Sequence, residues 1–121
     1  MKLKLLEPHF TICRIADMGA VNWNAPFCFR ARTDEECSLV CPEAYVPQDV
    51  LVRDDGWRAM RIEGVLDFSL VGILAKLAGI LAEHAIPVFA VSTYNTDYLL
   101  VKLEKWSSAL DALRAEGYEM E

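Results

Sequence analysis

The sequence predicts an α+β fold in which antiparallel strands carry two helices on one face. Hydrophobic residues make up 54% of the 121 residues, which is enough for a buried core. Residues 1–56 show short alternating runs that are typical of strands. Residues 57–121 switch between strand and helix periodicity in the order β-α-β-β-α-β. This order is that of the ferredoxin-like split β-α-β arrangement.

The first half of the chain is expected to contain four short strands. Residues 10–15, 27–32 and 37–41 alternate or are rich in β-forming residues, and residues 50–53 are a fourth, shorter run of the same kind. Asp54, Asp55 and Gly56 are turn-forming residues, so we expect the chain to reverse there before the next strand.

The second half is expected to begin with a strand over residues 57–62, followed by a helix that starts near Ser69. Serine is a good N-cap because its hydroxyl accepts a hydrogen bond from a free backbone N–H. Apolar residues then recur at helical spacing, at Leu70, Ile73, Leu74, Leu77, Ile80 and Leu81. The opposite face carries small residues that allow a second element to approach closely, namely Gly72, Ala75, Gly79 and Ala82.

A hairpin is expected over residues 86–101. Two β-rich runs, 86–91 and 98–101, flank the polar cluster Ser92–Asp97. The cluster is longer than a simple chain reversal needs, which indicates a place where something polar is held. The plainer interpretation is that Ser, Thr, Asn and Asp only stabilise the turn by bonding to nearby backbone.

The chain is expected to end with an amphipathic helix and a short strand. Gly117 is a suitable C-terminal stop for the helix, and residues 118–120 form the strand. The apolar side of the helix is marked by Trp106, Ala109, Leu110 and Leu113. No exact internal repeat is visible, but the first half is interpretable as a degraded copy of the second with shrunken helices.

Charge and targeting signals exclude several classes of protein. The net charge of −6 argues against nucleic acid and against an anionic membrane surface as partners. Neither a signal peptide nor an apolar run long enough to span a membrane is recognisable. We therefore expect a cytoplasmic protein.

The metal-binding residue types are scattered along the sequence. The four cysteines, at positions 13, 28, 37 and 41, form no CxxC pair, and His9 and His84 have no ligands at suitable spacing. Cys37 and Cys41 share a strand face with Leu39, which predicts buried, reduced thiols. We expect no metal, no cofactor and no catalytic constellation.

Three segments resemble ACT domains, the small regulatory modules that bind amino acids. They are Asp55–Ala59, Phe68–Ala75 and above all Ile86–Val101, which contains the string Ser-Thr-Tyr-Asn-Thr-Asp. The match is closer to the CASTOR-type ACT proteins, a group of small bacterial proteins and eukaryotic arginine sensors. The resemblance implies two tandem ACT-like units, a degenerate one over residues 1–61 and a second over 62–121 whose first strand begins near 57. It also implies that strands can be exchanged between the units.

The resemblance further implies a ligand site, without catalysis, at an interface between ACT units where a helix start faces a hairpin. Because the chain is about half as long as the arginine sensors, a complete site would need a homodimer. Gly72 takes the place of the glycine at the helix start, while Thr96 stands where the arginine sensors often have an aromatic residue. The candidate ligand-binding residues are Ser69, Val71, Gly72, Ile73, Thr93, Tyr94, Thr96 and Asp97.

These residues have the chemistry to bind an amino acid. A helix start offers free N–H groups and partial positive charge to a carboxylate, and Asp97 can accept an ammonium or guanidinium group. The sequence thus predicts a non-catalytic regulatory protein that binds a small molecule, expected to be an amino acid. The alternative is a protein-interaction or dimerisation module that has kept the scaffold without a ligand. An enzyme is the third hypothesis.

Overall fold

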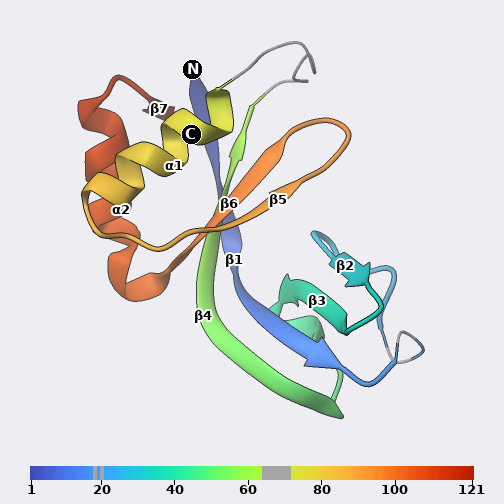
Figure 1. Ribbon diagram of the computed structural model, residues 1–121. Coiled ribbons are helices and arrows are strands. Elements are labelled where there is room, and N and C mark those ends of the chain that lie inside the picture. Colours follow the sequence, from blue (N-terminus) through green and yellow to red (C-terminus); the bar gives the residue numbers. More distant parts are fainter. Residues whose placement is uncertain (18, 20, 64–71) are drawn as a thin grey trace. The chain divides into compact units, whose positions relative to one another are not determined.

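The computed structural model describes residues 1–121 except 18, 20 and 64–71. The chain forms two compact units (Figure 1). We call Met1–Glu7 together with Arg58–Glu121 the C-terminal unit, and Pro8–Trp57 the N-terminal unit. The sequence analysis expects a division into residues 1–61 and 62–121. In the structure the first seven residues group with residues 58–121.

A sheet with two helices forms the C-terminal unit. In its sheet β4 lies between β1 and β6, β6 pairs with β5 in an antiparallel hairpin, and β7 runs parallel to the start of β1. The strands are β1 (Lys2–Ile15), β4 (Val50–Ile62), β5 (Phe89–Ser92), β6 (Asp97–Lys102) and β7 (Glu119–Met120). The sheet is therefore mixed, and the prediction of antiparallel strands was wrong for β7. The reason is that residues 2–7 contribute a strand to this sheet, whereas the prediction took its strands from residues 57–121 alone.

Both predicted helices are present in the C-terminal unit. Helix α1 spans Ile73–Glu83 and α2 spans Trp106–Ala115, after the short 3-10 helix η3 (Leu103–Lys105). They contact each other and lie on the same side of the sheet, which confirms the expected layering (Figure 1). No helix in the described part of the chain is long and apolar enough to cross a membrane.

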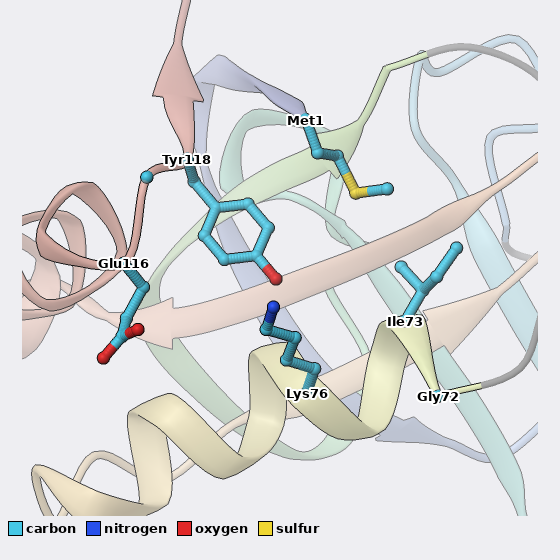
Figure 2. A pocket seen from close by; sticks show the side chains of 7 residues that line it. Met1, Gly72, Ile73, Lys76, Glu116 and Tyr118 are labelled. Carbon is cyan, nitrogen blue, oxygen red and sulfur yellow. The ribbon is translucent and has the colours of Figure 1, made fainter.

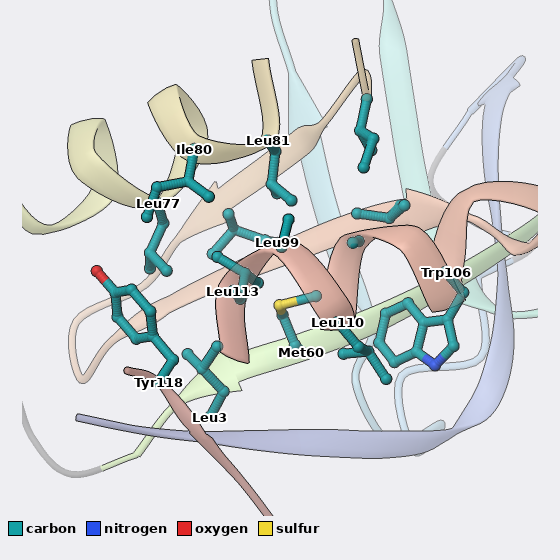
Figure 3. Close-up of a cluster of buried hydrophobic side chains, with 14 of the residues drawn as sticks. Leu3, Met60, Leu77, Ile80, Leu81, Leu99, Trp106, Leu110, Leu113 and Tyr118 are labelled. Atoms are coloured by element: carbon teal, nitrogen blue, oxygen red, sulfur yellow. The ribbon is translucent and has the colours of Figure 1, made fainter. Parts of the chain in front are cut away.

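One hydrophobic core joins the helices to the sheet of the C-terminal unit. Leu77 and Leu81 from α1 meet Leu113 from α2, while Met60 and Leu99 come from β4 and β6 (Figure 3). All five side chains are completely buried. The helical spacing of the apolar residues thus places them where the sequence analysis expects, facing the sheet.

The α1 helix begins later than predicted. Its first residue is Ile73, and Gly72 occupies the N-cap position with a φ of +80° and no side-chain cap. Left-handed backbone of this kind favours glycine. Ser69, the expected N-cap, lies outside the described residues, as does Val71.

The N-terminal unit contains no counterpart of the two helices among its described residues. Its strands lie in the order β2 (Phe29–Arg32), β3 (Cys37–Pro42), β1 and β4, and the 3-10 helix η2 (Glu43–Tyr45) follows β3. A small core of its own surrounds Cys13, Leu39 and Cys41. Cys41 is buried as predicted, and Cys37 is half-buried.

The expected turn at Asp54–Gly56 does not exist. Residues 50–62 form the single strand β4. The chain does not reverse here, and backbone groups of this stretch bond to other segments. The Gly56 N–H donates to Glu43 Oε2 at 2.8 Å, and the Thr11 hydroxyl donates to the Asp54 carbonyl at 3.3 Å. Gly56 nevertheless keeps the positive φ, +82°, that its turn propensity indicated.

The strand boundaries differ in two further places. The first strand begins at Lys2 rather than residue 10 and continues through Pro8, and β2 begins at Phe29 because Phe27 adopts a φ of +55° that breaks the extended chain. The hairpin turn comprises residues 93–96 only, since Ser92 and Asp97 still pair across the ladder.

The two hairpins of the chain share one register. Phe29 lies opposite Val40 in the first hairpin, and Phe89 lies opposite Leu100 in the second. A 3-10 helix follows the second strand in both cases. The two described hairpins therefore have the same spacing between their paired residues.

The Cys41 thiol supplies a test of the N-terminal core. Burial raises its pKa to about 12, with a further contribution from the nearby thiols of Cys13 and Cys28. Because the thiol pKa is higher in the folded protein, the fold is stabilised at pH values below the ordinary thiol pKa of 9.0. This stabilisation is lost as the pH rises through the pKa of the folded protein. We expect the free energy of unfolding to fall between about pH 9 and pH 12 more steeply in the wild type than in Cys41→Ala.

The accompanying measurement is alkylation at about pH 8.5, read by mass spectrometry. Cys41 is expected to stay unmodified in the folded protein and to react after denaturation, because only thiolate is nucleophilic. Equal rates of modification in both states would contradict the burial described above.

Candidate functional site

An open cavity lies at the start of α1 in the C-terminal unit. Its volume is about 320 Å³, within the range of about 300–1,000 Å³ typical of small-molecule sites. Two of the predicted site residues, Gly72 and Ile73, line it. The other described residues that line it are Met1, Lys76, Glu116, Gly117 and Tyr118 (Figure 2).

The start of α1 forms one wall of the cavity. The first intrahelical bond that involves the cap runs from the Lys76 N–H to the Gly72 carbonyl at 2.8 Å. The residues between them belong to the first turn of the helix, where backbone N–H groups lack acceptors within the helix. This end of the helix carries partial positive charge, and the Lys76 side chain adds a full one.

The end of α2 forms the opposite wall. Glu116 is the C-cap, and Gly117 adopts a φ of +93° that ends the helix. The Tyr118 N–H then donates to the Leu113 carbonyl at 3.2 Å and the Gly117 N–H to the Arg114 carbonyl at 3.0 Å, a pattern common at helix C-termini. The local geometry thereby places Glu116 and Tyr118 beside the cavity.

The predicted hairpin residues do not line this cavity. The Thr96 hydroxyl is buried and donates to the Ile62 carbonyl at 2.7 Å. The Thr93 hydroxyl donates to the Thr96 carbonyl at 3.0 Å, and Tyr94 is 80% exposed at the turn. Asp97, half-buried, begins β6.

The turn role of Thr93 has a parallel in the first hairpin. The Thr33 N–H donates to the Glu36 carbonyl at 2.9 Å, and the Thr93 N–H donates to the Thr96 carbonyl at the same distance. In both turns the threonine hydroxyl also contacts the residue three positions later. Part of the polar richness of the hairpin is therefore explained by turn stability.

The sequence analysis missed most of the cavity. Lys76 lies four residues after Gly72, so helical geometry places both on one face, and this spacing could have identified it. Glu116 and Tyr118 carry no such signal, because they reach the cavity only through the packing of α2 against α1.

The described residues contain no group of His, Cys, Asp or Glu placed to hold a metal ion. Among the described residues, charged and polar groups of Lys76, Glu116 and Tyr118 line the cavity together with a helix start, and such groups can bind a small polar molecule through charge and hydrogen bonds.

Comparison with known proteins identifies a family and several relatives of this chain. Residues 52–115 match the family model of the ACT domain. The rat and human proteins named cytosolic arginine sensor for mTORC1 subunit 1 are each 38% identical to this chain over 77 residues. That match covers 59% of this chain and 23% of each relative, so the matched segment spans under a quarter of their length.

Solved structures extend the similarity to almost the whole chain. A crystal structure of an Agrobacterium tumefaciens protein superposes with a TM-score of 0.88 at 31% identity, covering 99% of this chain and 91% of that one. A Clostridium acetobutylicum aspartate kinase shares only the fold, with a TM-score of 0.62 at 11% identity, covering 88% of this chain and 32% of the kinase. From the family match and this architecture, the chain belongs to the ACT domain family.

Proposed function

We propose that this chain is a non-catalytic, cytoplasmic regulatory protein that binds a free amino acid. The observation that carries the proposal is the cavity at the start of α1, lined by Gly72 and Ile73, two of the residues expected to bind a ligand. The relatives named as cytosolic arginine sensors support both the ligand class and the compartment, and make arginine the first amino acid to test.

The proposal includes two tandem ACT-like units and a homodimer. The matching registers of the two hairpins support the tandem arrangement. The cavity is open, and the hairpin residues Thr93, Tyr94 and Asp97 do not line it within one chain. A hairpin supplied by a second copy would bring Asp97 to the ligand and complete the site.

Amino-acid binding is tested by thermal unfolding with each of the twenty standard amino acids at millimolar concentration. A ligand at a hundredfold excess over its Kd stabilises the folded state by about 2.7 kcal/mol, which raises the melting temperature by several degrees. We expect at least one amino acid to do so. A panel without any shift would contradict the proposed function.

Asp97→Ala tests the part assigned to the hairpin. We expect it to abolish the ligand-induced shift while leaving the melting temperature of the free protein nearly unchanged, because Asp97 is only half-buried. Asp111→Ala, at an exposed position on α2, is the matched control and should keep the shift. A shift that survives in Asp97→Ala would remove this residue from the site.

One observation favours a second function, a protein-interaction module without ligand. The outer face of α1 exposes Ala75, Gly79 and Ala82, and a Cβ built on Gly79 would meet nothing within 4 Å. Small residues of this kind permit close helix approach. Sedimentation of Gly79→Leu separates the two: loss of the dimer with retained amino-acid binding would assign this face to association alone.

A further inference from the structure

The Trp106 side chain carries a buried polar group without a partner. The residue is the first of α2, is only 7% exposed and packs in the hydrophobic core of the C-terminal unit. Its indole Nε1–H is buried and donates no hydrogen bond to any described residue. Figure 3 shows the indole at the edge of this core, with its nitrogen on the side remote from Leu99 and Leu113. A buried indole N–H normally finds an acceptor, so we expect one from outside this chain.

The Arg58 guanidinium lies beside this indole and is also short of acceptors. Its Cζ atom lies 4.8 Å from the centre of the Trp106 ring, and its Nε–H donates to the Leu6 carbonyl at 2.9 Å. Arg58 is half-buried, and in the part of the chain that the structure describes no carboxylate forms an ion pair with it. A partly buried cation without a counter-charge is unfavourable, so this second observation also indicates a missing anion.

One anion would satisfy both groups, because they lie together in the C-terminal unit. The bond from Nε to the Leu6 carbonyl orients the guanidinium and leaves its two Nη groups to bind the ligand. A carboxylate or phosphate has several oxygen atoms, so one oxygen can accept from Arg58 while another accepts from Trp106. The start of α2 has no side-chain cap, and its partial positive charge adds to the attraction.

We propose that Arg58 and Trp106 form a binding site for a small oxyanion, a carboxylate or phosphate group, at the start of α2. Neither residue is among those that line the cavity at the start of α1. The inference therefore goes beyond the proposed function: it adds a second ligand site to the C-terminal unit. Its failure would leave amino-acid binding at the first cavity untouched.

The test is a titration of the whole chain with sodium phosphate and, separately, with sodium acetate, at constant pH and ionic strength. NMR follows the Trp106 indole N–H resonance, which is assigned by its loss in Trp106→Phe. We expect at least one of the two anions to shift this resonance in a saturable way, because the anion becomes the acceptor of that N–H. The resonance of the exposed Trp23 is the internal reference and should not move.

Arg58→Gln should weaken anion binding about tenfold, because a charge-assisted hydrogen bond is lost. Trp106→Phe keeps an apolar ring in the core and should weaken binding severalfold in a calorimetric titration, which keeps the test open if Arg58→Gln does not fold. Two variants are controls that should bind like the wild type. Lys76→Gln removes the ammonium beside the cavity at the start of α1, and Arg114→Gln removes an exposed cation from α2.

Each outcome decides for or against the site. A saturable shift that depends on Arg58 but not on Lys76 supports it, and a response to phosphate alone or to acetate alone identifies which group the ligand carries. A Trp106 resonance that neither anion moves at tens of millimolar overturns the site. An affinity that both Arg58→Gln and Trp106→Phe leave unchanged overturns it too, as does binding that Lys76→Gln abolishes, since the anion would then occupy the cavity at the start of α1.

Discussion

Replacement of Leu113 by alanine is expected to destabilise the protein by about 2–5 kcal/mol, since a fully buried leucine leaves a cavity that its neighbours fill only in part. Leu113 lies at the centre of the contact between α2, α1 and the sheet, next to Leu77 and Leu99 (Figure 3). Urea unfolding followed by circular dichroism measures the loss.

Leu51→Ala is the control for this effect. It removes the same atoms from a side chain that is 61% exposed on β4, and the expected change in the free energy of unfolding is within about 0.5 kcal/mol. If Leu113→Ala were as mild as Leu51→Ala, the core of the C-terminal unit would not be held between helices and sheet as described.

The second large effect is expected from Thr96→Val, which removes a buried hydroxyl without much change in volume. The Ile62 carbonyl that accepts its hydrogen bond at 2.7 Å would lose that partner. An unsatisfied buried acceptor costs about 1–3 kcal/mol, which the shift of the urea midpoint measures.

Thr96→Ser retains the hydroxyl and should preserve most of the stability that Thr96→Val loses. If serine and valine destabilised equally, packing of the threonine methyl group rather than the hydrogen bond would hold the hairpin to β4. The result also bears on the site, because a hydroxyl engaged with Ile62 has no free proton for a ligand.

The sequence predicted best the helices, whose apolar residues recur at helical spacing. The apolar stripes of α1 and α2 face the sheet, and Gly117 ends α2, because local geometry alone decides these features. The continuity of β4 could not be predicted in the same way. Asp54–Gly56 is a turn sequence by composition, but it lies within the strand, where Thr11 and Glu43, both distant in sequence, form hydrogen bonds with its backbone.

In the candidate site, too, some residues could be predicted from the sequence and others could not. Gly72 and Ile73 were predicted from the resemblance to ACT domains, and they line the cavity. Glu116 and Tyr118 were not predicted, since only the packing of α2 brings its end to the start of α1. Thr93 and Thr96 were predicted for their hydroxyls, which the structure shows bonded within the chain.

A crystal structure with the most stabilising amino acid tests the central claim most directly. The account predicts electron density for the amino acid at the start of α1, in the cavity that Gly72 and Ile73 line. Density for the amino acid at another place, with this cavity holding only solvent, would contradict it.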